Sequence, residues 1–316
     1  MNTTGEPDRT DGRAPRGSGD DHATIEATET FLAHRKLLFT VAYEMLGSVA
    51  DVDDVLQETW LRWTAVNTAD VTEPRAYLVR ITTRQALNRL RSVKRRRETY
   101  VGSWLPEPLI TAPDVAGDVE LAESVSMALM LVMETLSPTE RAVFVLHEAF
   151  GFGYDEIAAA VDKTPGAVHQ IAHRARRHVE ARRPRRSVSV REAETAVAAF
   201  RHALETLDLQ ELLDILAPEV VAIADGGGLK QAWPRPIIGS DKVARFIMAG
   251  PPRHNVTYSV ETTSVNGSPA LAFYVDGQFD GIMAMNIADN RITEIYFIRN
   301  PQKLTNLTAE TELTLR

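Results

Sequence analysis

The segment 137–177 constrains the fold of this chain most, because its helix start signals fix where successive helices begin. Ser137-Pro138 can cap and open one helix, and Glu140 lies three residues after the cap, as a capping box requires. Thr164-Pro165 repeats the start signal for a final helix. The apolar residues of that final helix recur at helical spacing and predict one buried stripe, formed by Val168, Ile171, Ala172, Ala175 and Val179. The segment therefore predicts a helix, a second short helix, a tight turn and a last helix.

The opposite face of the last helix is basic and polar, which indicates what it binds. Its outward residues carry side chains that can bond base edges or phosphates. An ordinary amphipathic helix pair with a solvated basic face is the structural alternative. We favour a helix-turn-helix that reads DNA, and the predicted contacts are Thr164, Gly166, Ala167, His169, Gln170, His173, Arg174 and Arg177.

A second basic helix argues against an ordinary amphipathic helix pair. Residues 74–97 contain nine Lys or Arg and no acid, yet they still show a helical apolar stripe. Positive charge concentrated on one amphipathic helix is typical of a phosphate-binding surface. Two such helices, far apart in the chain, predict two contact points on one nucleic acid. The contacts expected from this helix are Arg75, Arg80, Arg84, Asn88, Arg95, Arg96 and Arg97.

The overall charge is acidic but is unevenly distributed. The formal net charge of −8 would argue against nucleic-acid binding if it were spread evenly, but residues 98–140 alone contain eight acids and no base. The chain has no cysteine, which excludes disulfides and thiolate zinc sites. No apolar run is long enough to cross a membrane, and the first 24 residues are expected to form a disordered tail and not a signal peptide. We expect a cytoplasmic protein without metal or cofactor.

The chain divides into two helical bundles and an α+β domain. The expected parts are a tail (1–24), a first bundle (25–98), an acidic linker (99–117), a second bundle (118–184), a third domain (190–305) and a second tail (306–316). In the third domain helices precede strands, and turn signals occur at Asn266-Gly267, Asp276-Gly277 and Asp289-Asn290. This order predicts an α+β domain with an antiparallel sheet.

The whole pattern resembles an extracytoplasmic-function (ECF) sigma factor of the subgroup that carries a fused C-terminal SnoaL-like domain. Residues 51–63 (DVDDVLQETWLRW) resemble the segment that grips RNA polymerase. Residues 74–97 resemble the helix that reads and opens the minus-ten promoter element, and residues 137–177 resemble the domain that reads the minus-thirty-five element. Three further segments resemble the signature motifs of the fused subgroup, namely residues 104–109 (WLPEPL), 225–228 (DGGG) and 300–304 (NPQKL). The resemblance implies two all-α sigma bundles followed by a cone-shaped α+β barrel.

The resemblance also implies partners, namely promoter DNA and core RNA polymerase through its beta and beta-prime subunits. The implied polymerase contacts are Asp51, Asp54, Gln57, Glu58, Leu61 and Trp63, the last two as apolar anchors. Core packing is the alternative for Trp60 and Trp63, and we expect at least one of them to be in the core. Melting requires a pocket for a base pulled out of the stack, and the loop 67–73 is positioned to supply it.

The signature motifs imply contact between the third domain and the sigma bundles. The expected regulatory contacts are Trp104, Leu105, Pro106, Asp225, Gly226, Gly227, Lys230, Asn300 and Pro301. The chain departs from the pattern where Leu229 stands between the third glycine and Lys230. The linker is either a solvated tether or a segment that runs along polymerase. A free tether has no use for a tryptophan, so we expect Trp104 to dock on the third domain or on polymerase.

Another hypothesis gives the third domain a small ligand or an enzymatic role. An acid or base in such a barrel would be Asp225, His254 or Asp280, with Trp233, Tyr258 and Phe273 as pocket walls. No second carboxylate is spaced to form a dyad, so we expect no catalysis and expect the domain to regulate the sigma bundles in cis. Two alternatives stay open: a helix-turn-helix regulator with a ligand-sensing barrel, and a SnoaL-type enzyme with a DNA-binding arm.

Overall fold

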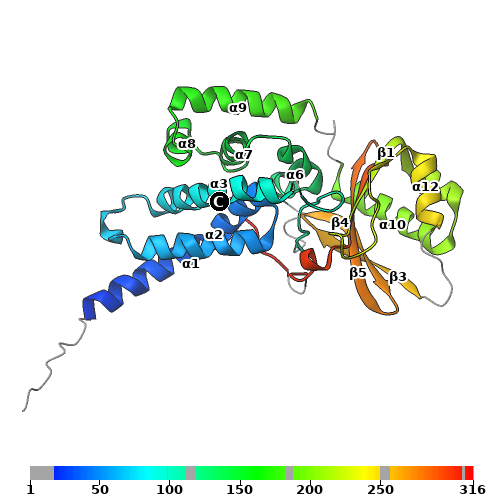
Figure 1. The fold of residues 1–316 in the computed structure, drawn as a ribbon, viewed down its shortest axis with the longest axis horizontal. Helices are drawn as coiled ribbons and strands as arrows, with labels where there is room; N and C mark the ends of the chain where they lie inside the picture. The colour runs from blue at the N-terminus through cyan, green and yellow to red at the C-terminus, as the bar shows by residue number, and fades with distance from the viewer. Residues whose placement is uncertain are drawn as a thin grey trace, which may run out of the picture.

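The computed structural model describes residues 18–97, 99–111, 118–182, 188–249, 257–307 and 310–315. The first bundle within them consists of α1 (Ser18–Leu46), α2 (Val49–Thr64), the short 3-10 turn η1 (Thr68–Asp70) and α3 (Pro74–Arg97) (Figure 1). Ser48 caps α2, because its side chain accepts from the backbone N of Asp51. Pro74 opens α3 at the predicted position. Residues 18–24, predicted as part of a tail, are helical instead.

The second bundle has the predicted helix-turn-helix. Its elements are α5 (Val119–Ser124), α6 (Met127–Glu134), α7 (Pro138–Phe144), the π-helical turn η2 (Val145–Ala149), α8 (Tyr154–Val161) and α9 (Pro165–Glu180). The capping box of Ser137 and Glu140 is formed, and Thr164 Oγ1 accepts from the backbone N of Ala167 at the start of α9. Asp162, at φ 56°, takes the left-handed conformation that ends α8 and turns the chain into α9.

The C-terminal domain is α+β, as predicted, but its sheet is mixed. Its helices are α10 (Val190–Thr206), α11 (Leu209–Ile215) and α12 (Ser240–Ala249), and its strands are β1 (Leu216–Asp225), β2 (Ile237–Ile238), β3 (Tyr258–Val265), β4 (Ser268–Val275), β5 (Gln278–Ala288) and β6 (Arg291–Ile298). The strand order is β2-β1-β6-β5-β4-β3. The expectation of an antiparallel sheet was wrong for one pair, since β1 is parallel to β6. A crossover through α12 separates β1 from the hairpins that follow, so β1 joins the sheet beside the last strand.

The two faces of this sheet have different partners. Helices α10, α11 and α12 cover one face, where Val197, Phe200 and Val243 pack against Met283 and Ile295 (Figure 1). The other face carries Ala284, Tyr296 and Ile298, which pack against Leu105 of the linker and Met127 of α6. The sheet is therefore covered on its second face by the linker and by the second bundle.

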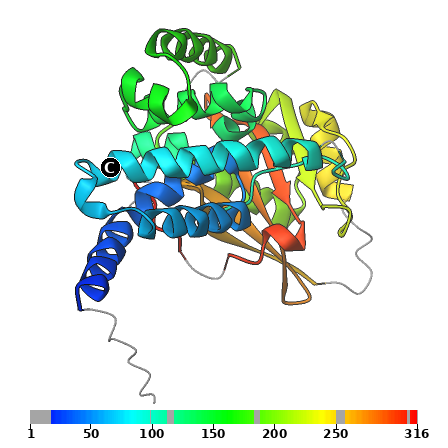
Figure 2. The ribbon, with the colours of Figure 1, turned by 60° about the vertical axis from the view of Figure 1, so that its left-hand side comes forward.

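The two helical bundles share one continuous hydrophobic core. This core includes Leu38 and Val52 of the first bundle, Val143 and Ile157 of the second, and Leu109 of the linker. Figure 2 shows α3 running across the molecule beneath the second bundle. The two helical bundles are thus closed on each other, with the C-terminal domain against both.

Residues 310–315, predicted as a second tail, pack on the first bundle. Leu313 belongs to the shared core, and the backbone N of Thr314 donates to Thr40 Oγ1 of α1 at 3.1 Å. Thr311 N donates to the backbone O of Ile110 at 2.7 Å, so this segment also touches the linker. A short η3 turn (Pro301–Lys303) precedes it.

Candidate DNA-binding surfaces and the interdomain junction

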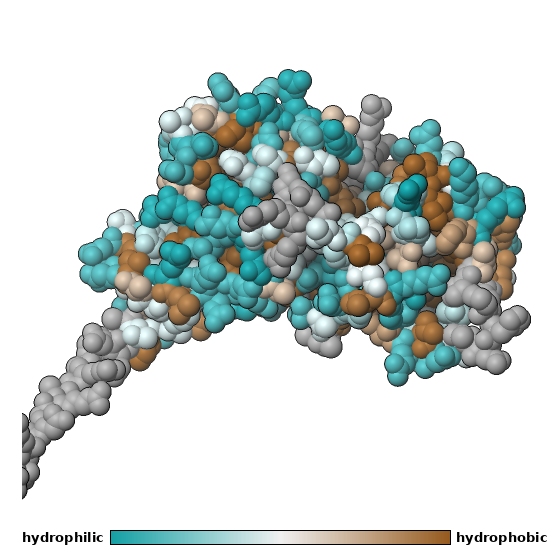
Figure 3. Space-filling model, in the orientation of Figure 1, coloured by the Kyte–Doolittle hydropathy of each residue, from teal (hydrophilic) through white to brown (hydrophobic). Residues whose placement is uncertain are grey.

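The predicted contact face of α9 is open to solvent. His169, Gln170, His173, Arg174 and Arg177 are all exposed, while Val168, Ala172, Ala175 and Val179 are buried as the apolar stripe predicted. Thr164 and Gly166 are exposed, and Ala167 is half-buried. The surface over α9, at the top of the view, is largely hydrophilic (Figure 3). The arrangement presents a basic and polar helix face of the kind that enters a major groove.

Two residues of the predicted contact face of α3 touch the second bundle, although the exposed Arg84 and Asn88 leave part of this face open. Arg84 Nη2 donates to the backbone O of Ala159 in α8 at 2.8 Å, and the Arg75 guanidinium lies 4.9 Å from the ring centre of Phe152. Arg80 stacks over Tyr77 of its own helix at 4.7 Å, and Asn88 is exposed. Arg95, Arg96 and Arg97 lie within α3, but their side chains are outside the described part of the structure.

The loop before α3 forms a cavity that the second bundle helps to enclose. Its volume is about 370 Å³, and it lies among residues 70–73, Tyr77 and Arg80 on one side and Glu156 and Ala159 of α8 on the other. This loop was predicted to hold a base pulled out of the stack. In the closed arrangement a glutamate from α8 contributes to the wall of that cavity.

The predicted polymerase face of α2 is only partly available. Gln57 and Glu58 are exposed, and Leu61 is 60% exposed, as an apolar anchor requires. Asp51 is buried and shares Arg89 with the exposed Asp54, at 2.6 Å from each carboxylate.

The prediction that Trp63 is a polymerase anchor was wrong. Trp63 is 1% exposed, and its Nε1 donates to the backbone O of Ala27 at 2.8 Å. The early turns of α1, which include Ala27, supply this acceptor. The alternative that at least one of Trp60 and Trp63 lies in the core is confirmed.

A buried carboxylate, that of Asp225, joins the linker to the C-terminal domain. It accepts from Tyr100 Oη at 2.6 Å, from Leu105 N at 2.9 Å and from Lys303 Nζ at 2.7 Å. Lys303 also donates to the backbone O of Leu105, and Asn300 Nδ2 donates to Tyr100 Oη at 2.7 Å. We call these five residues the linker clasp.

The glycines after Asp225 are needed for close approach. A Cβ on Gly226 would collide with the backbone O of Lys230, and a Cβ on Gly227 would collide with the side chain of Asn300. Gly227 also has a φ of 62°, which disfavours other residues. Pro301 is exposed and opens the η3 turn that carries Lys303.

Trp104 docks on the C-terminal domain, which confirms one of the two expected positions. Its ring centre lies 4.3 Å from Lys303 Nζ, a cation–π contact. Its other side approaches the first bundle, since a Cβ on Gly47 would lie 3.1 Å from the ring. Leu105 and Pro106 are buried.

Glu107 fastens the linker to the first bundle. Its carboxylate accepts from Ser48 Oγ at 2.8 Å and from Val49 N at 2.6 Å, and its backbone O accepts from Tyr43 Oη at 2.6 Å. Burial raises the pKa of Glu107, although the hydrogen bonds from Ser48 and Val49 act in the opposite direction.

Asn266, at the tip of the β3–β4 turn, contacts three parts of the chain at once. Its Nδ2 donates to Tyr43 Oη of the first bundle and to the backbone O of Val125 in the second, each at 2.8 Å. Its Oδ1 accepts from Leu109 N of the linker at 3.0 Å. The residue was predicted only as a turn former, and its φ of 53° fits that role as well.

Lys230 does not reach Asp225. It pairs with Asp280 at 2.7 Å, and Arg299 Nε binds the same carboxylate at 2.8 Å. Burial would raise the pKa of Asp280, but the Arg299 and Lys230 side chains outweigh it and hold that pKa below its usual range. Lys303, which was not among the predicted contacts, is the lysine that binds Asp225.

The candidate acid–base residues of the C-terminal domain do not come together. Asp225 is held in the linker clasp and Asp280 by two cations. Trp233 and Phe273 pack in an aromatic cluster with Phe297, whereas Tyr258 is exposed. His254 lies outside the described residues. The geometry offers no acid–base pair among the described candidates.

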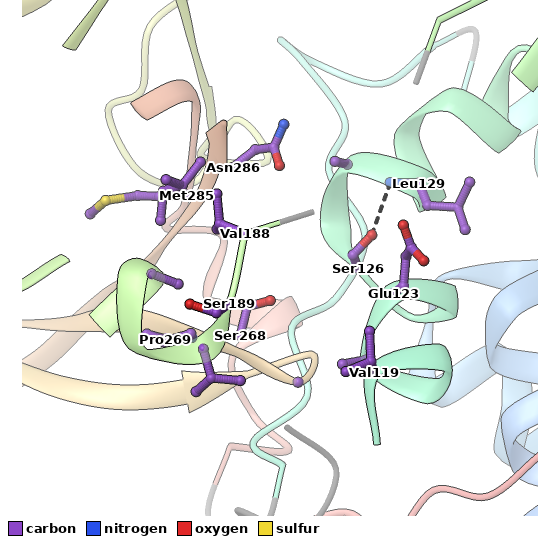
Figure 4. Close-up of a pocket in the computed structure, with 16 residues that line it drawn as sticks. Val119, Glu123, Ser126, Leu129, Val188, Ser189, Ser268, Pro269, Met285 and Asn286 are labelled. Carbon is purple, nitrogen blue, oxygen red and sulfur yellow. Dashed lines mark hydrogen bonds between the residues drawn. The ribbon is translucent and has the colours of Figure 1, made fainter. Parts of the chain in front are cut away.

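A cleft of about 170 Å³ separates the second bundle from the C-terminal domain (Figure 4). Val119 and Leu129 line one side, and Val188, Pro269 and Met285 line the other. The cleft contains none of the predicted site residues. Within the described ranges, no group of three or more His, Asp or Glu could hold a metal, and no helix is long and apolar enough to span a bilayer.

Comparison with known proteins identifies the two bundles. The Sigma-70 region 2 family matches residues 30–96, and the Sigma-70, region 4 family matches residues 126–179. The chain is 36% identical over 296 residues to the ECF RNA polymerase sigma factor SigJ of Mycobacterium tuberculosis (strain ATCC 25618 / H37Rv), which covers 89% of this chain and 94% of that protein. This chain belongs to the ECF sigma-factor family. As a sigma factor it directs promoter-specific transcription initiation with core RNA polymerase and promoter DNA, a role that is not catalytic.

Further matches extend over the C-terminal domain of this sigma factor. The probable ECF RNA polymerase sigma factor SigI of M. tuberculosis (strain CDC 1551 / Oshkosh) is 32% identical over 282 residues, covering 88% of this chain and 94% of that protein. The crystal structure of M. tuberculosis SigJ superposes with a TM-score of 0.71 at 32% identity, covering 89% of this chain and 99% of that chain. The predicted fold class, two sigma bundles followed by an α+β domain, is confirmed.

The predicted contacts did not include Tyr100, Glu107, Lys303 or Asn266 of the junction. Lys303 was visible as the lysine of the NPQKL motif, but its partner could not be chosen from spacing alone. Asn266 gave only a turn signal. No sequence signal pointed to Tyr100.

Proposed function

We propose that α9 of this sigma factor reads the minus-thirty-five element, that α3 and the loop 67–73 read and melt the minus-ten element, and that the C-terminal domain regulates both in cis. The contrast between the two DNA faces supports this proposal most. The face of α9 is exposed, whereas Arg84 of α3 is bonded to α8 and the bundles share a core. The closed arrangement must open before both faces can reach one promoter.

The polymerase surface proposed here is smaller than the sequence suggested. It consists of the exposed side chains of α2, Asp54, Gln57, Glu58 and Leu61. We assign the beta and beta-prime subunits as its partners, and the cytoplasm as the compartment where they meet. Arg95, Arg96 and Arg97 are retained as clamps on the DNA backbone.

The cis-regulatory role rests on the linker clasp and on Glu107. The same short linker segment is bonded to the C-terminal domain through Asp225 and to the first bundle through Ser48 and Val49. A linker that is bonded to the C-terminal domain and to the first bundle limits how far the bundles can separate. We therefore propose that release of the clasp favours the form that binds polymerase.

Transcription in vitro with sigma-free core polymerase tests the proposal. With a library of randomised promoter sequences, the protein should select start sites that share two upstream motifs. Gln170→Ala should relax the upstream motif, at a cost of about 1–3 kcal/mol if the amide reads a base directly. Arg84→Ala should affect the downstream motif or promoter opening. Arg245→Ala, an exposed change on α12, is the matched control and should alter neither. Unselected initiation by the parent protein would refute the proposal.

A further inference from the structure

The contact between the two bundles buries opposite charges. Glu44 of α1 and Arg141 of α7 are each 1% exposed. Arg141 Nε donates to the backbone O of Glu44 at 3.0 Å, and Nη1 binds the carboxylate of Glu134. The Glu44 carboxylate accepts from Ser124 Oγ of α5 at 2.8 Å. The guanidinium of Arg141 therefore meets the backbone of Glu44 and not its carboxylate.

The hydrogen bonding of this pair is incomplete. Nη2 of Arg141 has no acceptor among the described residues, although the atom is buried. Burial raises the pKa of Glu44 to about 8, and burial lowers the pKa of Arg141 to about 9. Both directions mean that the closed contact disfavours the charged forms.

Buried ionisable groups of this kind do not by themselves make an interface strong. Apolar side chains of similar volume often pack in place of a buried ion pair with no loss, or a gain, of stability, whereas loss of one partner leaves an uncompensated charge. Around Glu44 and Arg141 lie apolar side chains of the shared core, with Ser124 and Glu134 as polar neighbours. The two charged groups are fully solvated only when the bundles separate.

We propose that Glu44 and Arg141 form a release element, which keeps the closed contact weak enough for core polymerase to separate the bundles. The inference deepens the proposed function, and its consequence for transcription rests on that function. Separation of the two bundles can be measured without transcription.

Energy transfer between two dyes measures the opening. The chain has no cysteine, so Glu29→Cys in α1 and Glu180→Cys in α9, both exposed, give two unique labels. In the free protein Arg141→Met should lower the transfer efficiency, since the Glu134 carboxylate and the backbone O of Glu44 both lose the group that binds them. In Glu44→Leu/Glu134→Leu/Arg141→Met, which replaces all three groups by apolar ones, the efficiency should stay high, and about tenfold more core polymerase should be required to lower it. Ser124 keeps its bond to the backbone O of Leu121 in both variants.

A matched control separates this effect from the loss of any ion pair. Glu148→Leu/Arg176→Met removes a pair within the second bundle, 2.5 Å between Arg176 Nη2 and Glu148 Oε1, and should change neither the free-protein efficiency nor the polymerase titration. A variant changed at 44, 134 and 141 that opens as easily as the parent, or more easily, overturns the proposal. Normal opening without promoter selection would instead count against the proposed function.

Discussion

Lys303 shows how a single residue links distant parts of this molecule. Its ammonium binds the Asp225 carboxylate, the backbone of Leu105 and the face of Trp104, which come from the sheet and the linker. The sequence predicted a contact at Lys230, although its distance from the glycines departs from the family pattern, and it predicted none at Lys303. In the structure Lys230 pairs with Asp280. Spacing alone does not reveal which cation reaches a carboxylate across the fold.

Lys303→Met should destabilise the junction, because it leaves the fully buried Asp225 carboxylate without its cation. We expect a loss of about 3 kcal/mol, with an earlier first transition in thermal unfolding. Lys230→Met is the matched control, since Asp280 keeps Arg299 and the Lys230 side chain is itself 34% exposed. Its cost should stay below about 1 kcal/mol. Equal shifts for the two variants would contradict the role given to Lys303.

At the scale of elements, prediction from sequence succeeded where a start signal was local. The first residues of α3, α7 and α9 are each a proline at the predicted position. It failed where burial depended on a distant segment. Trp63 is buried by the early turns of α1, whose length has no strong local signal, and β1 pairs with β6 in parallel across a long crossover. The contact between α3 and α8 could not be predicted either, because a periodicity pattern describes one helix at a time.

The exposure of α9 predicts that the free protein binds duplex DNA through this helix alone. Arg174→Ala/Arg177→Ala should weaken that binding and reduce its dependence on salt, because each lost phosphate contact lowers the slope by about 0.9. Arg84→Ala should leave free-protein binding unchanged, since that side chain is engaged with α8. Fluorescence anisotropy with a labelled duplex measures both. Equal weakening by the α3 variant would show that α3 is accessible in the closed form.

For the whole molecule, the closed arrangement should depend on pH. The pKa of Glu44 is raised to about 8 in the closed form, and that of Glu107 is raised as well, so closing binds protons that the open form releases. The stability of the closed form is therefore complete at low pH and is lost as the pH rises through about 8. The groups facing Glu44 are Arg141 of α7, Glu134 of α6 beside it, and Tyr43 of the same helix. The lowered pKa of Arg141, about 9, acts in the opposite direction only at higher pH.

Energy transfer between the bundles should thus decrease from pH 6 to pH 8. Glu44→Gln keeps the shape of the side chain but cannot ionise, so it should reduce this dependence and leave only the contribution of Glu107. A transfer efficiency that is constant or rises over the same interval would contradict the assignment.

The order of the junction residues along the chain has a consequence for synthesis. Asp225, Asn266 and Lys303 all come after both sigma bundles. A ribosome therefore delivers two complete bundles before the groups that restrain them, and domains generally fold as units in that order. Every newly made copy passes once through an unrestrained stage, whose duration is set by the translation and folding of the C-terminal domain.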